Sequence, residues 1–156
     1  MRGRSRTDGG MNRDFAEMLA ALSAAGAEYL VVGAHALAAH GRPRATGDLD
    51  LWVRPTLDNA RRVWQALVAF GAPLDELRLE DLASPEVVFQ IGVVPARIDI
   101  LTSLTGIEFD EAWPHRQMIE VDGLMLPFLS REDLIRNKAA LGRPRDLADI
   151  DDLQRA

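Results

Sequence analysis

The clearest pattern along the chain is the alternation of polar and apolar residues in segment 48–53, Asp-Leu-Asp-Leu-Trp-Val. Successive side chains of a β-strand point to opposite faces of its sheet. A strand here therefore places Asp48 and Asp50 on one face and the aliphatic residues between and after them on the other. This alternation predicts a sheet that packs helices on one face and is open to a ligand on the other, because strands buried on both faces read as continuous apolar runs.

The same alternation returns in a predicted strand over residues 96–101, where Arg97 and Asp99 face one way and two isoleucines face the other. If this strand lies beside the first, Asp99 joins Asp48 and Asp50 as a third carboxylate. A third apolar segment, 28–33, predicts a strand that ends in a turn at Gly33.

Periodicity and turn residues divide the rest of the chain into helices and further strands. Asp122-Gly123 predicts a tight hairpin, and Ser130 predicts a helix N-cap. The remaining predictions are helices over 12–25, 34–40, 56–70, 108–116, 130–141 and from Asp146 onward, and strands over 87–91, 117–121 and 124–128.

These elements together predict the α/β (α+β) class, with a mixed sheet, helices mainly on one face and a helical C-terminal end. Residues 1–11 are expected to be a disordered N-terminal segment. Residues 12–129 are expected to form the core, with 130–156 packed on it as a helical segment.

Composition narrows the classes of function. The net charge of −6 argues against general DNA or RNA coating. The absence of cysteine excludes disulfides and thiolate metal sites. No apolar run is long enough for a membrane helix, so we expect a cytoplasmic protein without a membrane partner.

The three aspartates are the clearest candidates for a functional site, because they could bind a cation. Carboxylates placed side by side repel one another unless a cation lies between them. Hard oxygen ligands without cysteine favour Mg²⁺ or Mn²⁺ over Zn²⁺. The alternative is that the aspartates are solvated residues of an edge strand. The Gly33 turn, which leads into a helix N-terminus where backbone N–H groups can bind phosphate, adds only weak support.

These residues resemble the signature of the DNA polymerase β-type nucleotidyltransferase superfamily. The resemblance consists of Val32-Gly33-Ala34, thirteen intervening residues, Asp48-Leu49-Asp50-Leu51 and the later strand aspartate Asp99. Segment 44–48, Arg-Ala-Thr-Gly-Asp, resembles the branch that contains the AbiE toxins, and Lys138, Arg143 and Asp146 resemble that branch's Lys-x4-Arg-x2-Asp motif.

The resemblance implies a minimal nucleotidyltransferase fold and transfer of NMP from an NTP to an unknown hydroxyl acceptor on RNA, protein or a small molecule. It implies that Asp48 and Asp50 hold two Mg²⁺ ions and that Asp99 completes one metal site and helps to take the acceptor proton. The residues it implies for nucleotide binding are Gly33, Ala34, Arg44, Thr46, Lys138 and Arg143. Ala34 departs from the Gly or Ser of many members and lacks a hydroxyl for phosphate.

Several alternatives remain at this stage. The chain is also compatible with a non-catalytic antitoxin or binding half of a two-component module, with a protein partner from an adjacent gene. Lys138 and Arg143 can instead be cations that complement a helix C-terminus, and Asp146 can tether Arg143 or cap the last helix. We expect His35 and His40 to be polar surface or turn residues, and Asp149, Asp151 and Asp152 to form a solvated face; His115 has no partner in the sequence.

Overall fold

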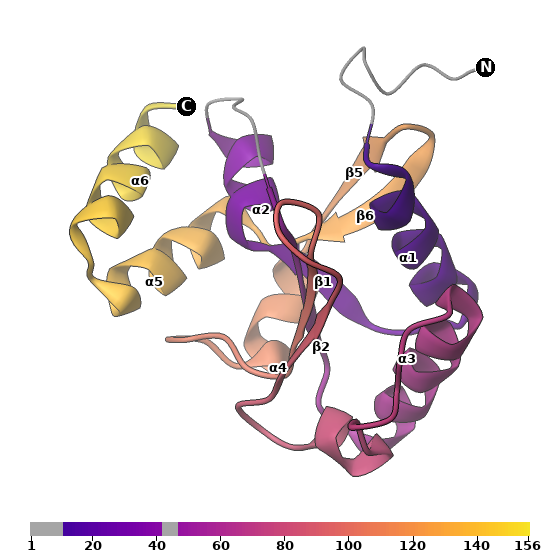
Figure 1. Cartoon of the computed structure of the whole chain (residues 1–156). Helices are drawn as coiled ribbons and strands as arrows, with labels where there is room; N and C mark the ends of the chain where they lie inside the picture. Colours follow the sequence, from indigo (N-terminus) through magenta and orange to yellow (C-terminus); the bar gives the residue numbers. More distant parts are fainter. Residues whose placement is uncertain (1–10, 42–46) are drawn as a thin grey trace.

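The computed structural model describes residues 11–41 and 47–156. Its centre is a six-stranded mixed sheet in the order β3-β4-β2-β1-β6-β5 (Figure 1). Pairs β1–β2, β3–β4 and β5–β6 are antiparallel, whereas β2–β4 and β1–β6 are parallel. The strands are β1 Tyr29–Val32, β2 Leu49–Val53, β3 Val88–Ile91, β4 Ile98–Leu101, β5 Gln117–Val121 and β6 Leu124–Phe128.

The helices begin and end where capping residues require it. The side chain of Asn12 accepts hydrogen bonds from the first turn of α1, and Thr56 and Ser130 cap α3 and α5 in the same way. The helices are α1 Arg13–Ala24, α2 Gly33–His40, α3 Leu57–Phe70, α4 Phe109–Ala112, α5 Arg131–Leu141 and α6 Pro144–Arg155, with 3-10 turns η2 Leu79–Ala83 and η3 Trp113–His115.

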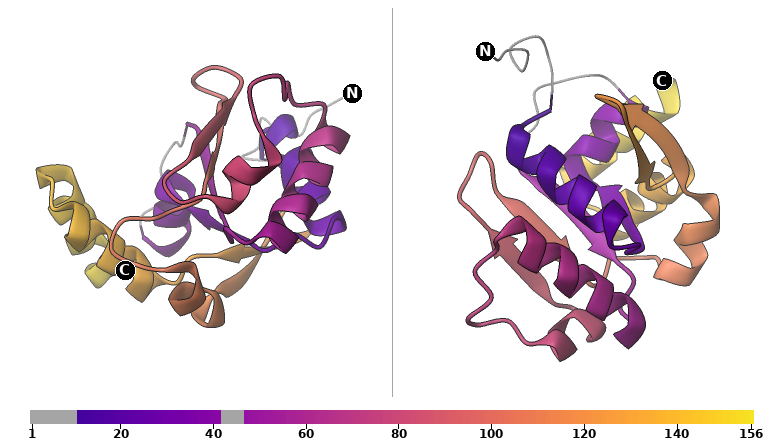
Figure 2. Two further views of the ribbon diagram at one scale, coloured as in Figure 1. Left: turned by 90° about the horizontal axis from the view of Figure 1, so that it is seen from below. Right: turned by 90° about the vertical axis from the view of Figure 1, so that its right-hand side faces the viewer.

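The sheet separates two environments. Helices α1 and α3 lie side by side over one face, whereas α2 and the α5–α6 pair lie on the other side (Figure 2). The main core forms where the aliphatic residues of β1, β2 and β4 meet α1 and α3, and Leu51, Val63 and Ile100 are fully buried there. The alternation along β2 therefore divides the core from the face that carries the aspartates.

Most of the predicted elements are present, including the α/β class with a mixed sheet and a helical C-terminal end. The hairpin at Asp122-Gly123 is confirmed, and both residues have positive φ, as a two-residue turn of this kind needs. The last helix begins at Pro144 rather than at Asp146. Proline is favoured in the first turn because no intrahelical partner is needed for its missing N–H.

Two expectations about the organisation of the chain are not tested by the structure. The predicted disorder of residues 1–11 falls almost wholly outside the described residues, and the division at residue 129 stays a prediction. None of the helices within the described ranges combines the length and apolar character needed to cross a lipid bilayer.

Candidate functional site

The three aspartates come together through strand pairing. Strand β2 lies between β1 and β4, and Asp50 is directly opposite Asp99 in the parallel β2–β4 register. Asp48 is two residues before Asp50 and therefore points to the same face. The sequence-based expectation that the two polar strands are neighbours is confirmed.

Gly33 makes room for the carboxylate of Asp50. The residue has a φ of +69°, and a Cβ built on it would lie 2.3 Å from Asp50 Oδ2. Both the left-handed backbone and the close approach exclude a side chain at this position. The turn from β1 into α2 thus lets the backbone of Gly33 lie against Asp50.

Arg97 links the other two carboxylates. Its Nε and Nη2 donate to the two oxygens of Asp99 at 2.8 and 3.2 Å. Its Nη2 also lies 3.2 Å from Asp48 Oδ2, and its backbone N–H donates to Asp48 Oδ1 at 3.0 Å. Arg97 therefore neutralises charge on Asp48 and Asp99 from within the site.

Asp50 has no comparable partner among the contacts of the described chain. Burial, the negative charges of Asp99 and Asp48 and a hydrogen bond with Asp99 together raise the pKa of its carboxyl group to about 6, although Arg97 opposes the shift. The site as a whole therefore carries more negative charge than its own arginine balances.

The three aspartates have the type of ligand atom that a hard divalent cation prefers, but their side chains are not arranged as a metal site. Carboxylate oxygens from three converging aspartates are the ligands that Mg²⁺ and Mn²⁺ prefer. Among the residues that the structure describes, however, no three acidic or histidine side chains already stand as a preformed metal site. Arg97 engages the oxygens of Asp48 and Asp99. A cation bound by these carboxylates would therefore compete with this guanidinium.

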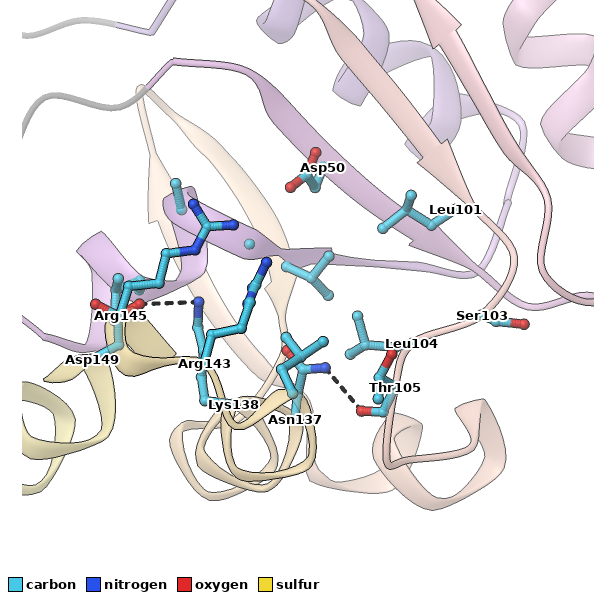
Figure 3. A pocket seen from close by; sticks show the side chains of 15 residues that line it. Asp50, Leu101, Ser103, Leu104, Thr105, Asn137, Lys138, Arg143, Arg145 and Asp149 are labelled. Atoms are coloured by element: carbon cyan, nitrogen blue, oxygen red, sulfur yellow. Dashed lines mark hydrogen bonds and ion pairs between the residues drawn. The ribbon is translucent and has the colours of Figure 1, made fainter. Parts of the chain in front are cut away.

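A cavity of about 460 Å³ opens between the aspartate face of the sheet and the α5–α6 turn (Figure 3). Asp50 and the Gly33–Ala34 turn line one wall. Lys138, Arg143 and Arg145 line the opposite wall, together with Asn137 and Asp149. A cavity with a carboxylate on one side and three cations on the other suits a ligand that carries both phosphate and a bound cation.

Asp146 holds Arg143 and Lys138 in place on the wall of the cavity that carries the cations. Its side chain is inaccessible to solvent. Its oxygens accept hydrogen bonds from Nε, Nη2 and the backbone N–H of Arg143, at 2.5 to 3.1 Å. Lys138 Nζ lies 3.6 Å from Asp146 Oδ1 and 3.1 Å from Asp149 Oδ2. The hydrogen bonds from Arg143 are the main reason that the pKa of Asp146 falls to about 2. Asp146 both caps α6 and tethers Arg143, so the two alternatives for this residue are both correct.

The structure brings together most of the residues selected from the sequence. Gly33, Ala34, Asp50, Lys138 and Arg143 line one cavity. Asp48 and Asp99 pair with Arg97 and are not among the residues that line the cavity. Arg44 and Thr46 lie outside the described residues, and their role stays a prediction.

Other residues of the site were missed or misplaced. The alternation places Arg97 on the aspartate face but does not indicate its contacts, and the sequence carries no comparable signal for Asn137, Thr105 or Arg145. Asp149 was expected on a solvated face, but its side chain is 14% exposed and pairs with Lys138. The three-residue spacing between Asp146 and Asp149 on one helix would have suggested that both face α5.

Two of the histidines hold segments near the site. His40 Nε2 lies 2.7 Å from the carbonyl oxygen of Leu129, and His35 Nε2 lies 3.3 Å from that of Gly47. Burial lowers the pKa of His35. Both histidines are partly exposed, and each contacts a segment that is separated from it in sequence.

Comparisons with known proteins support the fold. No family model and no curated protein matches the sequence. Among solved structures, the chain is similar to a Thermotoga maritima protein assigned provisionally to the nucleotidyltransferases, with a TM-score of 0.61, 15% identity and coverage of 94% of this chain and 96% of that one.

Two further structures give the same result. The lincosamide antibiotic adenylyltransferase LnuA, solved with lincomycin bound, matches with a TM-score of 0.58, 13% identity and coverage of 93% and 97%. An antigenic nucleotidyltransferase-like protein from Paracoccidioides brasiliensis matches with a TM-score of 0.52, 17% identity and coverage of 90% and 74%. At these identities the likeness concerns the fold, and this chain has the nucleotidyltransferase fold. The narrower resemblance to the AbiE branch stays a prediction.

Proposed function

We propose that the protein is a divalent-cation-dependent nucleotidyltransferase that moves NMP from an NTP to a hydroxyl acceptor. The observation that supports the proposal is the convergence of Asp48, Asp50 and Asp99 in this fold, with Asp50 facing Lys138, Arg143 and Arg145 across one cavity. The partners in this proposal are an NTP and an acceptor on RNA, protein or a small molecule, in the cytoplasm.

Each wall of the cavity has a task in the proposed reaction. Lys138, Arg143 and Arg145 would bind the phosphates through charge-assisted hydrogen bonds. Asp48, Asp50 and Asp99 would hold Mg²⁺ or Mn²⁺, which when bound supplies charge neutralisation at the phosphate and leaving-group oxygens. Asp99 would also accept the proton of the acceptor hydroxyl.

The bond changes balance without a further reactant. The acceptor oxygen forms a bond to the α-phosphorus, the bond between that phosphorus and the bridging oxygen to the β-phosphate breaks, and pyrophosphate leaves. The Gly33–Ala34 turn would offer only backbone groups to the phosphates, because Ala34 has no hydroxyl.

A label-transfer experiment tests this function. The wild-type protein is incubated with each α-³²P-labelled NTP, Mg²⁺ and total cellular RNA or protein, with Asp50→Asn as the control. We expect label in one acceptor fraction with the wild type and none with the variant. Equal labelling by both proteins, or Mg²⁺-independent binding of every NTP, contradicts the proposal.

A second candidate is a non-catalytic binding half of a two-component module, with a protein partner from an adjacent gene. The observations that favour it are Ala34 and the engagement of Asp48 and Asp99 by Arg97. Co-expression with the product of an adjacent gene, followed by size-exclusion chromatography, tests it. A stable complex together with NTP binding but no transfer supports this candidate over the enzyme.

A further inference from the structure

Arg97 occupies the carboxylate cluster as a cation would. It lies immediately before β4, two residues before Asp99, and its side chain is 28% exposed. All four carboxylate oxygens of Asp48 and Asp99 contact its guanidinium or its backbone N–H, at 2.8 to 3.2 Å. None of these contacts includes Asp50, which lines the cavity instead.

We propose that Arg97 is a built-in counter-cation that holds Asp48 and Asp99 in a resting state and that a divalent ion must displace before the site is complete. This inference rests on the proposed function and concerns its regulation. Arg97 is a positioning residue, because it acts on the carboxylates and not on the substrate.

The geometry gives the reason for competition. A carboxylate oxygen that accepts a hydrogen bond from a guanidinium has one lone pair fewer for a metal, and the positive charge of the guanidinium opposes a second cation beside it. Because Arg97 engages Asp48, immediately before β2, and Asp99 on β4 together, one side chain competes with a metal at two of the three candidate ligands. Its partial exposure lets the guanidinium turn toward solvent without unfolding the strands.

Because a divalent ion must displace Arg97, its affinity also depends on whether a nucleotide binds with it. The affinity for a free divalent ion is reduced by the stability of the Arg97 contacts, as for any ligand that binds a minor conformation. A cation that arrives with a triphosphate gains the contacts to the cationic wall in addition. The resting state therefore favours a cation bound with nucleotide over a free cation.

The chain offers a matched control in Arg54. This arginine also bridges two carboxylates from separate segments, Glu28 and Asp110, and its side chain is 20% exposed. It follows the other end of β2, with Val53 between it and Trp52. Loss of Arg54 therefore removes a comparable ion-pair network without touching the aspartate cluster.

The test measures Mn²⁺ binding without nucleotide by electron paramagnetic resonance for the wild type, Arg97→Gln and Arg54→Gln. We expect Arg97→Gln to bind Mn²⁺ about tenfold more tightly, the change that follows loss of a competing charge-assisted contact. Arg54→Gln should bind Mn²⁺ as the wild type does, although both variants lower the melting temperature in EDTA.

Arg97→Lys keeps the experiment informative if the glutamine variant does not fold. An ammonium retains the charge but cannot engage two carboxylates through a planar fork, so we expect an intermediate Mn²⁺ affinity. Unchanged or weaker Mn²⁺ binding by the Arg97 variants overturns the counter-cation role and leaves the proposed function standing. No Mn²⁺ binding by any of the proteins also overturns the counter-cation role, and the label-transfer experiment then tests the proposed function separately.

Discussion

Repulsion among the carboxylates falls mainly on Asp50. Asp48 and Asp99 share the charge of Arg97, whereas burial and the neighbouring carboxylates raise the pKa of Asp50 to about 6. A raised folded-state pKa means that the folded protein holds this proton more tightly than the unfolded chain does. The stability linked to this proton is complete below the unfolded value of about 4 and is lost as the pH rises through about 6.

The first prediction follows from the direction of this pH dependence. In EDTA at pH 8, Asp50→Asn should raise the free energy of unfolding by about 0.5–2 kcal/mol, a range that allows for solvent screening of a half-buried group. Near pH 4 the two proteins should be equally stable, because Asp50 is then protonated in the folded wild type. Urea unfolding at the two pH values measures the difference. A variant that is less stable than the wild type at pH 8 would show that Asp50 is a structural residue.

The second prediction concerns Gly33. Gly33→Ala should lower the free energy of unfolding by about 2–4 kcal/mol, because the methyl group meets Asp50 Oδ2 and the backbone is left-handed. Gly26 is the matched control, since its φ is +71° and a Cβ there would have nothing within 4 Å. Gly26→Ala should cost only the backbone strain of about 1–2 kcal/mol. Equal losses in thermal unfolding would mean that contact with Asp50 adds nothing.

At the scale of elements, the α5–α6 turn presents three cations to the cavity but holds them differently. Lys138 and Arg143 are fixed by Asp146, whereas Arg145 lines the cavity from an exposed position. Substitution of Lys138 or Arg143 would therefore change both protein stability and the proposed ligand binding. Arg145 therefore separates the two effects better than Lys138 does.

The third prediction uses this difference. Arg145→Ala should weaken binding of the preferred NTP by about 1–3 kcal/mol, as loss of a charge-assisted hydrogen bond does. The free energy of unfolding should change by less than about 0.5 kcal/mol, as for other surface substitutions. Calorimetric titration and thermal melting measure the two quantities. Arg155→Ala, on the same helix but away from this cavity, is the control, and a similar loss of binding there would point to general electrostatics.

Sequence patterns predicted elements better than contacts between them. The alternation in 48–53 and 96–101 and the Asp122-Gly123 hairpin are local signals, and the strands they predict are present. The sequence alone does not show that β2 and β4 are neighbours. The order of strands in the sheet shows it. The role of Arg97 could not be predicted, because it depends on Asp48, which lies 49 residues earlier. The burial of Asp149 likewise depends on how α6 packs against α5.

At the scale of the whole molecule, the fold assembles the site from three distant parts of the sequence. The Gly33 turn, the paired strands β2 and β4, and the α5–α6 turn meet around one cavity. Helices α1 and α3 pack on the opposite face and do not line this cavity (Figure 2). The hydrophobic core and the proposed binding site therefore use opposite faces of the same sheet, and the proposed cation site brings together carboxylates that repel one another.

The last prediction tests this conflict without knowledge of the substrate. In EDTA at pH 8, Asp50→Asn should melt at a higher temperature than the wild type, because the variant lacks the repelled charge. A few millimolar Mg²⁺ should reverse this order, since an ion that binds only the folded wild type adds stability according to its concentration and affinity. At an ion concentration about ten times the dissociation constant the gain is about 1.4 kcal/mol, or roughly 3–6 °C for a chain of this size. Ca²⁺ at the same concentration controls for general screening, because its larger radius and higher coordination number fit a three-carboxylate site less well. If Mg²⁺ shifts both proteins equally, the aspartates do not hold a cation. If the wild type is already the more stable protein in EDTA, the repulsion inferred for Asp50 is absent.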